Sequence, residues 1–158
     1  MKEGDKGFLR GLYDLKYLFG DKWVPAILVT LSDGPMQRKE ILSTISSYSI
    51  GEEWSDKRAV LHDSYLARTL KKMTEEGLLT RTRHTETFPV TVTYSLNPEV
   101  LTFLTLAETL VGWVDDHPEL IAQAQAAYSR RNGDEPDSLT GIDELDDLDI
   151  ADHEDEDE

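Results

Sequence analysis

Basic and hydroxyl-bearing side chains recur at helical spacing between residues 62 and 76. If Leu66, Leu70 and Met73 form the buried face of a helix with about 100° per residue, a set of polar side chains falls on its other sides. The set comprises Ser64, Arg68, Lys71 and Lys72 on the outer face, with Tyr65 and Thr69 on the flank. Arginine can bind guanine O6 and N7 in bidentate fashion, and lysine suits phosphates. The pattern indicates either a helix that enters the major groove of DNA or an ordinary solvated helix face.

A second basic cluster follows within residues 79–95, where the hydrophobic period changes from about 3.6 to 2 and predicts a hairpin. Arg81, Arg83 and His84 lie on its first strand and near its tip. A basic hairpin beside a DNA-binding helix can follow the DNA backbone or reach into the minor groove. Charges that protect a sheet edge would explain each arginine separately, but not the position of the cluster. We therefore expect both clusters to bind double-stranded DNA.

Catalytic and metal-binding residues form no comparable pattern. His62 and Asp63 are adjacent in the sequence, but no nucleophile or ligand spacing accompanies them. The chain has no cysteine, which excludes disulfides, zinc-thiolate sites and thiol-based sensing, and it has no glycine-rich phosphate loop. We expect no catalytic residue, no metal and no cofactor, and no residue identifies a small-molecule effector.

The net charge of −16 comes almost entirely from the last residues of the chain. All 16 Lys and Arg lie in residues 1–131 together with 18 Asp and Glu, so this part is nearly neutral. Residues 132–158 carry the other 14 acidic residues and no Lys or Arg. We therefore expect one domain over residues 6–131, followed by a disordered acidic tail. The acidity of the whole chain is thus no argument against a nucleic-acid partner.

The tail also contains scattered apolar residues, a pattern that can fold on a partner. They are Ile142, Leu145, Leu148 and Ile150. Two hypotheses follow: the tail serves solubility through self-repulsion, or it covers the basic helix and hairpin and competes with DNA.

Hydrophobic periodicity predicts the elements that would position the basic residues. Asp21 is expected to cap the second helix, Gly77 to end the fourth, and Asn97 with Pro98 to start the fifth. The fold class is mainly α with a small β-hairpin wing, a winged helix-turn-helix with added helices at both ends. Helices are expected over about 6–19, 23–31, 37–46, 62–76, 98–113 and 118–129, strands over 78–85 and 90–96, and a loop over 47–60.

Three segments follow one another in the chain: residues 20–41 with Gly-Asp-Lys-Trp, Ile-Leu and Gly-Pro, residues 66–81, and residues 89–96 with Val-Thr-Tyr-Ser-Leu. In this order they resemble the HxlR-type winged-helix regulators of bacteria, which are related to the MarR and PadR types. The likeness covers roughly residues 8–115. It implies a homodimeric transcription regulator whose first helix and 101–113 helix bury apolar side chains against the second copy. With no apolar run of 18 residues and no signal-peptide profile, a cytoplasmic, nucleoid-associated protein without a membrane partner is expected.

Three features depart from the family pattern. The cysteine common near the first helix is absent, and residues 36–39 lack the aromatic that usually follows the arginine. The segment between the third and fourth helices is about a dozen residues longer than usual and contains Trp54, Lys57 and Arg58; we interpret it as a surface loop. These departures leave open an alternative function, a winged-helix protein-interaction module or antagonist that uses the acidic tail and binds no specific DNA.

Overall fold

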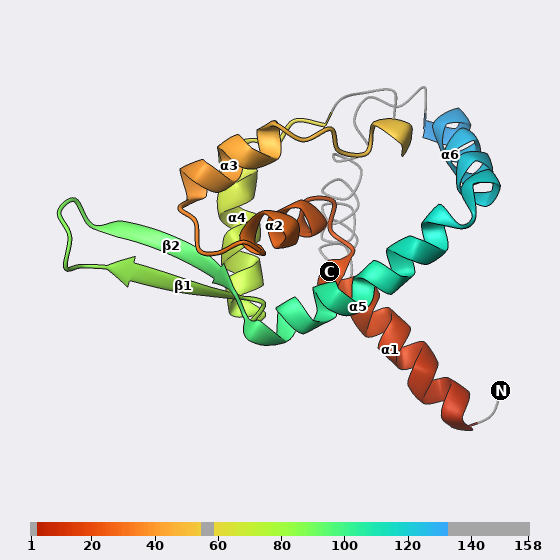
Figure 1. Cartoon of the computed structure of the whole chain (residues 1–158), viewed down its shortest axis with the longest axis horizontal. Coiled ribbons are helices and arrows are strands. Elements are labelled where there is room, and N and C mark those ends of the chain that lie inside the picture. Colours follow the sequence, from red (N-terminus) through yellow and green to blue (C-terminus); the bar gives the residue numbers. More distant parts are fainter. Residues whose placement is uncertain (1–2, 55–58, 133–158) are drawn as a thin grey trace, which may run out of the picture. The chain divides into compact units, whose positions relative to one another are not determined.

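The computed structural model describes residues 3–54 and 59–132, which group into two compact units (Figure 1). The first unit runs to residue 50 and continues from residue 59 to residue 116; the second comprises residues 51–54 and 117–132. Lys57, Arg58 and the acidic residues 133–158 lie outside the described part, so the expectations for them remain predictions.

The described elements follow the expected order of helices, hairpin and helices. The first unit contains α1 (Glu3–Phe19), α2 (Val24–Leu31), α3 (Arg38–Ser46), α4 (Asp63–Glu75), β1 (Leu79–His84), β2 (Thr91–Leu96) and α5 (Pro98–Asp115). The second contains the short 3-10 helix η1 (Glu52–Trp54) and α6 (Pro118–Asn132). The mainly helical fold with one antiparallel hairpin is confirmed. No helix in the described part of the chain has both the length and the apolar character to cross a membrane.

One hydrophobic core lies between α2, α3, α4 and the base of the hairpin. Each helix contributes the residues that its apolar period predicts, and Leu66, Leu70 and Met73 of α4 are fully buried as expected. Burial of such a side chain contributes about 1.5–3 kcal/mol each. The largest buried side chains are Trp23, Ile27, Leu28, Leu31, Ile41, Ile45, Leu66, Leu70 and Met73. The packing of these side chains therefore holds the outer face of α4 in place from behind.

A glycine joins α4 to the hairpin. Gly77 has a φ of +82°, which glycine adopts without the steric cost of a Cβ. Its N–H donates to the Thr74 carbonyl (3.1 Å), and the Leu78 N–H donates to the Met73 carbonyl (2.9 Å). These two bonds form a Schellman motif, and they confirm the expected end of the helix. Since Leu79 begins β1, the cap fixes the path from α4 into the hairpin.

The hairpin is anchored at its base and projects away from the helices at its tip (Figure 1). Its strands pair antiparallel, with Leu79 opposite Leu96 and Arg81 opposite Tyr94. The Met36 N–H donates to the Tyr94 carbonyl (3.0 Å), and the Tyr94 N–H donates to the Met36 carbonyl (2.8 Å). This bridge ties β2 to the segment before α3, so the hairpin has a defined direction relative to the helix-turn-helix.

The starts of two helices differ from the expectation. The N-cap of α2 is Trp23, not Asp21, because the Asp21 carboxylate accepts the Trp23 N–H (3.0 Å) in the turn before the helix. At α3 the N-cap is Gln37, whose N–H donates to the Glu40 carboxylate (2.8 Å) in a capping box. Asn97 does cap α5 as expected, with its side chain accepting the Glu99 N–H.

The second unit shows where part of the long α3–α4 connection lies. The connection is largely irregular, as expected, but η1 forms one turn within it. The ring of Trp54 packs edge-on against Tyr128 of α6, with centroids 5.8 Å apart and an interplanar angle of 83°. α6 itself continues to Asn132, beyond the expected end at Ser129. The connection and α6 therefore support one another.

Candidate nucleic-acid interface

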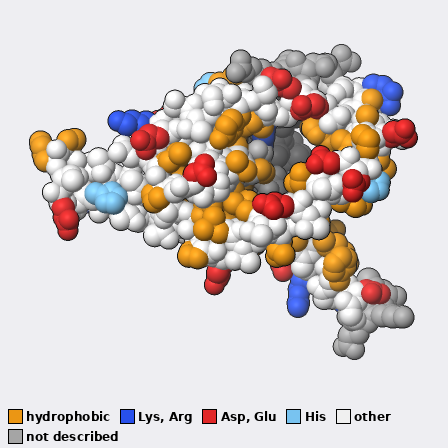
Figure 2. Space-filling model, in the orientation of Figure 1, with side chains coloured by type: hydrophobic (Ala, Val, Ile, Leu, Met, Phe, Trp, Pro, Cys, Tyr) orange, Lys and Arg blue, Asp and Glu red, His pale blue; other side chains and the backbone are white. Residues whose placement is uncertain are grey.

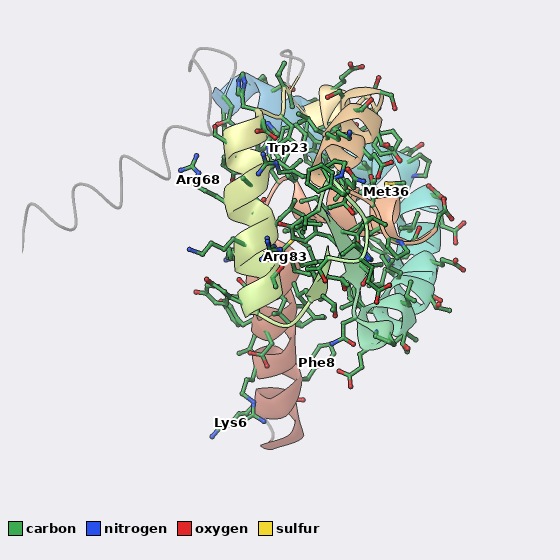
Figure 3. All side chains as sticks on the ribbon, turned by 90° about the vertical axis from the view of Figure 1, so that its left-hand side faces the viewer. Lys6, Phe8, Trp23, Met36, Arg68 and Arg83 are labelled. Carbon is green, nitrogen blue, oxygen red and sulfur yellow. The ribbon has the colours of Figure 1, made fainter. Side chains whose placement is uncertain are left out.

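The outer face of α4 is exposed and carries three cations. Its inner face is set by Leu70, which is 0% exposed. The exposed residues are Ser64, Arg68, Lys71 and Lys72. Figure 3 shows the Arg68 side chain extending away from the helix. Four of the six side chains expected to face DNA on this helix thus share one accessible surface.

Thr69 does not belong to this surface. Its side chain is buried, with 6% of the residue exposed, and its hydroxyl donates to the Tyr65 carbonyl (3.0 Å). The helical period explains the difference, because Thr69 is three residues from Leu66 and adjacent to Leu70, both in the core. A flank position at this helix therefore lies inside the contact with its neighbours, and the expectation of a DNA-facing Thr69 was wrong.

Tyr65 is half-buried and forms a contact that the sequence did not indicate. Its hydroxyl donates to the Asp21 carboxylate (3.1 Å), from the turn before α2 and 44 residues away in the chain. The Arg68 guanidinium lies over the Tyr65 ring, 5.5 Å from its centroid. Tyr65, which the sequence placed on the flank of the helix, thus connects the turn before α2 with an exposed cation.

The first turn of α4 adjoins a further cation. Arg38, the first residue of α3, forms an ion pair with Asp63 (3.1 Å), the first residue of α4. Both side chains are about half exposed. Arg38 was not among the expected DNA contacts, although the capping box at Gln37 could have placed it at the start of a helix. The pair brings a guanidinium beside the N-terminus of α4.

The hairpin separates its three basic residues onto two faces. Alternate residues of a strand share a face, so Arg81 and Arg83 lie on the side of Leu79 and His84 lies on the other. All three basic side chains are exposed. His84 is hydrogen-bonded through Nε2 to the hydroxyl of Thr93 on β2 (2.9 Å). The two arginines therefore make one face of the hairpin basic, and His84 belongs to the opposite, hydroxyl-bearing face.

A different kind of surface covers α1 and α5. Both helices expose large apolar side chains, which appear along them in Figure 2. Phe8 is 71% exposed and Leu106 is 66% exposed. Phe19 at the end of α1 stacks on Phe103 of α5, with centroids 3.9 Å apart and rings 6° from parallel. The exposed set is Phe8, Leu9, Leu12, Tyr13, Leu15, Tyr17 and Leu18 on α1, and Leu101, Leu106, Leu110, Val111, Trp113 and Val114 on α5.

The helix-turn-helix, its hairpin and the flanking helices together match a known family. The model of the HxlR-like helix-turn-helix family matches residues 18–121, more than half of the chain. The chain belongs to the HxlR-like helix-turn-helix family. This membership confirms the resemblance seen in the sequence, and it supports a DNA-binding transcriptional regulator as the general function.

Solved structures of transcriptional regulators share the fold of this HxlR-like protein. A MarR-family regulator from Enterococcus faecalis V583 is 17% identical, with a TM-score of 0.58 over 73% of this chain and 92% of that one. Diamide-treated YodB from B. subtilis is 24% identical, with a TM-score of 0.52 over 66% and 89%. The redox regulator HypR in its reduced form is 16% identical, with a TM-score of 0.55 over 72% and 98%. No curated protein sequence matches the chain significantly.

Proposed function

We propose that this chain binds a double-stranded DNA operator as a homodimer, with α4 in the major groove. The observation that carries the proposal is the outer face of α4, which is exposed and basic although its inner face is locked into the core. All three cations are exposed; Arg68 suits a guanine edge, whereas Lys71 and Lys72 suit phosphates. An ordinary solvated helix would not require a second basic element at its end.

The hairpin supplies that second element. Gly77 connects α4 directly to β1, and the Met36–Tyr94 bridge holds the base of the hairpin. Arg81 and Arg83 then extend beyond the core, where they can follow the DNA backbone or enter the minor groove. We assign these two arginines to positioning on DNA, because contacts to phosphate and sugar fix register without selecting sequence.

The homodimer follows from the apolar surfaces of α1 and α5. Monomeric proteins rarely expose a contiguous apolar patch larger than a few hundred Å². On α5, Leu106, Leu110 and Trp113 recur at i, i+4 and i+7, the spacing of a helix that packs against another. A second copy is the occupant we propose, since a two-fold axis would also place two α4 helices on successive half-sites.

We propose neither thiol sensing nor a particular small-molecule effector for this protein. YodB and HypR are described in diamide-treated and reduced forms, but this chain has no cysteine with which to respond in that way. Any signal that changes its DNA binding must therefore act through non-covalent contacts or through other chemistry.

The test is selection of duplexes from a random library by the full chain, followed by gel-shift titration of the enriched duplex and a scrambled one. The DNA flanking the protein's own gene serves as a second probe. Arg68→Ala should weaken binding to the enriched duplex by about 1–3 kcal/mol, and Arg83→Ala should weaken binding to both duplexes. Arg130→Ala, an exposed arginine of α6, is the matched control.

Two outcomes would overturn the assignment. If Arg68→Ala and Arg83→Ala both leave specific binding intact, these side chains do not form the DNA-binding surface. If no duplex is enriched at all, the winged helix serves as a protein-interaction module, and the DNA-binding assignment is wrong for this member of the family.

A further inference from the structure

The Arg68 guanidinium is the outermost member of a chain of contacts that begins in the turn before α2. The two oxygens of the Asp21 carboxylate accept different donors: Oδ1 accepts the Trp23 N–H (3.0 Å) and Oδ2 accepts the Tyr65 hydroxyl (3.1 Å). The Arg68 Cζ lies 5.5 Å from the centroid of the Tyr65 ring. Two side chains, Asp21 and Tyr65, therefore connect the backbone of the buried Trp23 to one exposed cation.

The inner end of this series of contacts, at Trp23 and Asp21, is rigid. Trp23 is buried in the core and is the N-cap of α2, so the N–H that Asp21 accepts has a defined position. Asp21 is half-buried and so is Tyr65. The hydroxyl of Tyr65 points inward to Asp21, which leaves the ring rather than the hydroxyl to face the outer surface. While this hydroxyl donates its hydrogen to Asp21, it cannot donate the same hydrogen to a base.

The outer end, the Arg68 side chain, is flexible. An arginine side chain has many rotamers, and ordering it on binding costs conformational entropy. A ring within about 6 Å of the guanidinium attracts it and reduces the number of orientations that it samples. Bidentate recognition of guanine requires two guanidinium N–H groups to lie in the plane of the base. A guanidinium whose orientation is restrained should therefore select guanine better than a freely rotating one.

We propose that Tyr65 and Asp21 are positioning residues for DNA sequence specificity, acting through Arg68 rather than through contacts of their own with DNA. This inference rests on the proposed function of α4. It assigns Tyr65 a different role from the direct DNA contact expected from the sequence, and it assigns Asp21 a role beyond the turn before α2.

The experiment is a double-substitution cycle on the full chain, with the enriched duplex, variants of it changed at single base pairs, and a scrambled duplex. The quantity compared is the ratio of affinities for the enriched and changed duplexes. Tyr65→Leu should lower this ratio by about two- to fivefold at the base pair that Arg68→Ala also affects. In the Arg68→Ala background, Tyr65→Leu should lower it no further.

Conservative variants separate the two positioning residues. Tyr65→Phe keeps the ring and removes the hydrogen bond to Asp21, so we expect a smaller loss of the ratio than for Tyr65→Leu. Asp21→Ala should cause no additional loss of the ratio when it is combined with Tyr65→Phe, because Tyr65→Phe has already removed the bond that joins Asp21 to Tyr65. Tyr48→Leu, a partly exposed tyrosine at the end of α3, is the matched control, and circular dichroism confirms that each variant is folded.

The outcomes distinguish this inference from the function on which it rests. The positioning role would be overturned if Tyr65→Leu weakened binding to all duplexes equally. It would also be overturned if Tyr65→Leu lowered the affinity ratio by the same factor in the wild-type and Arg68→Ala backgrounds. Failure of Arg68→Ala itself to change the ratio would instead refute α4 as the base-reading helix. A loss confined to one base pair that disappears in the Arg68→Ala background supports the proposal.

Discussion

The helix-turn-helix and the outer helices handle their apolar residues in opposite ways. α2, α3 and α4 bury theirs within one chain, as the 0% exposure of Leu70 illustrates, whereas α1 and α5 leave side chains such as Leu106 open to solvent. The first region is structurally complete in a single copy. The second exposes side chains of the kind that normally lie in a protein interior. The two regions should therefore respond differently to substitution and to protein concentration.

The largest effect is expected in the complete region. Leu70→Ala should lower the free energy of unfolding by about 2–5 kcal/mol, because it leaves a cavity between α4 and the other core helices. Urea unfolding followed by circular dichroism measures the loss. Val29→Ala, an exposed position on α2, should change the unfolding free energy by about 0.5 kcal/mol or less, and an equal loss at both sites would contradict the assignment of the core.

The next effect concerns the incomplete region. Leu106→Glu places a charge on the apolar stripe of α5, and burial of an unpaired charge in an interface costs about 3 kcal/mol or more. The dimer dissociation constant should therefore rise by about 100-fold or more, as measured by sedimentation equilibrium. Thr105→Glu introduces the same charge on the neighbouring polar side of α5 and should leave the dimer intact. A wild-type chain that stays monomeric at all concentrations would refute the dimer.

A smaller change is expected from a lysine on the outer face of α4. Lys71→Ala should weaken binding to specific and scrambled duplexes alike, and it should reduce the slope of log affinity against log salt by about 1. Titrations at several salt concentrations give this slope. A loss confined to the specific duplex would assign Lys71 to a base instead of a phosphate.

The smallest effect at physiological salt is expected from the acidic residues. If residues 132–158 compete with DNA for α4 and the hairpin, their deletion should tighten DNA binding, most clearly at low salt where charge interactions are least screened. Replacement of their Asp and Glu by Asn and Gln should have the same effect without a change in length. Unchanged affinity over the whole salt series would leave solubility as their role.

Local signals predicted most of the fold. The period of Leu66, Leu70 and Met73 indicated both faces of α4, and Gly77 indicated its end, because helix packing and capping depend on residues a few positions apart. The strict alternation after residue 90 likewise indicated β2. These elements are specified by neighbours in the sequence.

The details of the site depended on contacts between distant residues. Tyr65 meets Asp21 across 44 residues, and no local pattern of either residue indicates the pairing. The helical period places Thr69 beside the buried Leu66 and Leu70, but how far the core extends around α4 depends on the neighbouring elements that pack against it. The packing of Trp54 on Tyr128 joins two segments that looked unrelated, so the long α3–α4 connection was expected only as a surface loop.

Methylation interference at guanine N7 on the enriched duplex tests the central claim most directly, because N7 lies in the major groove where we place Arg68. The account predicts interference at guanines in two half-sites about 10–10.5 base pairs apart, or a multiple of that spacing, as expected for a two-fold symmetric pair of α4 helices. In Arg68→Ala the interference at the contacted guanine should disappear. Interference at one half-site alone, or an unchanged pattern in Arg68→Ala, would contradict the account.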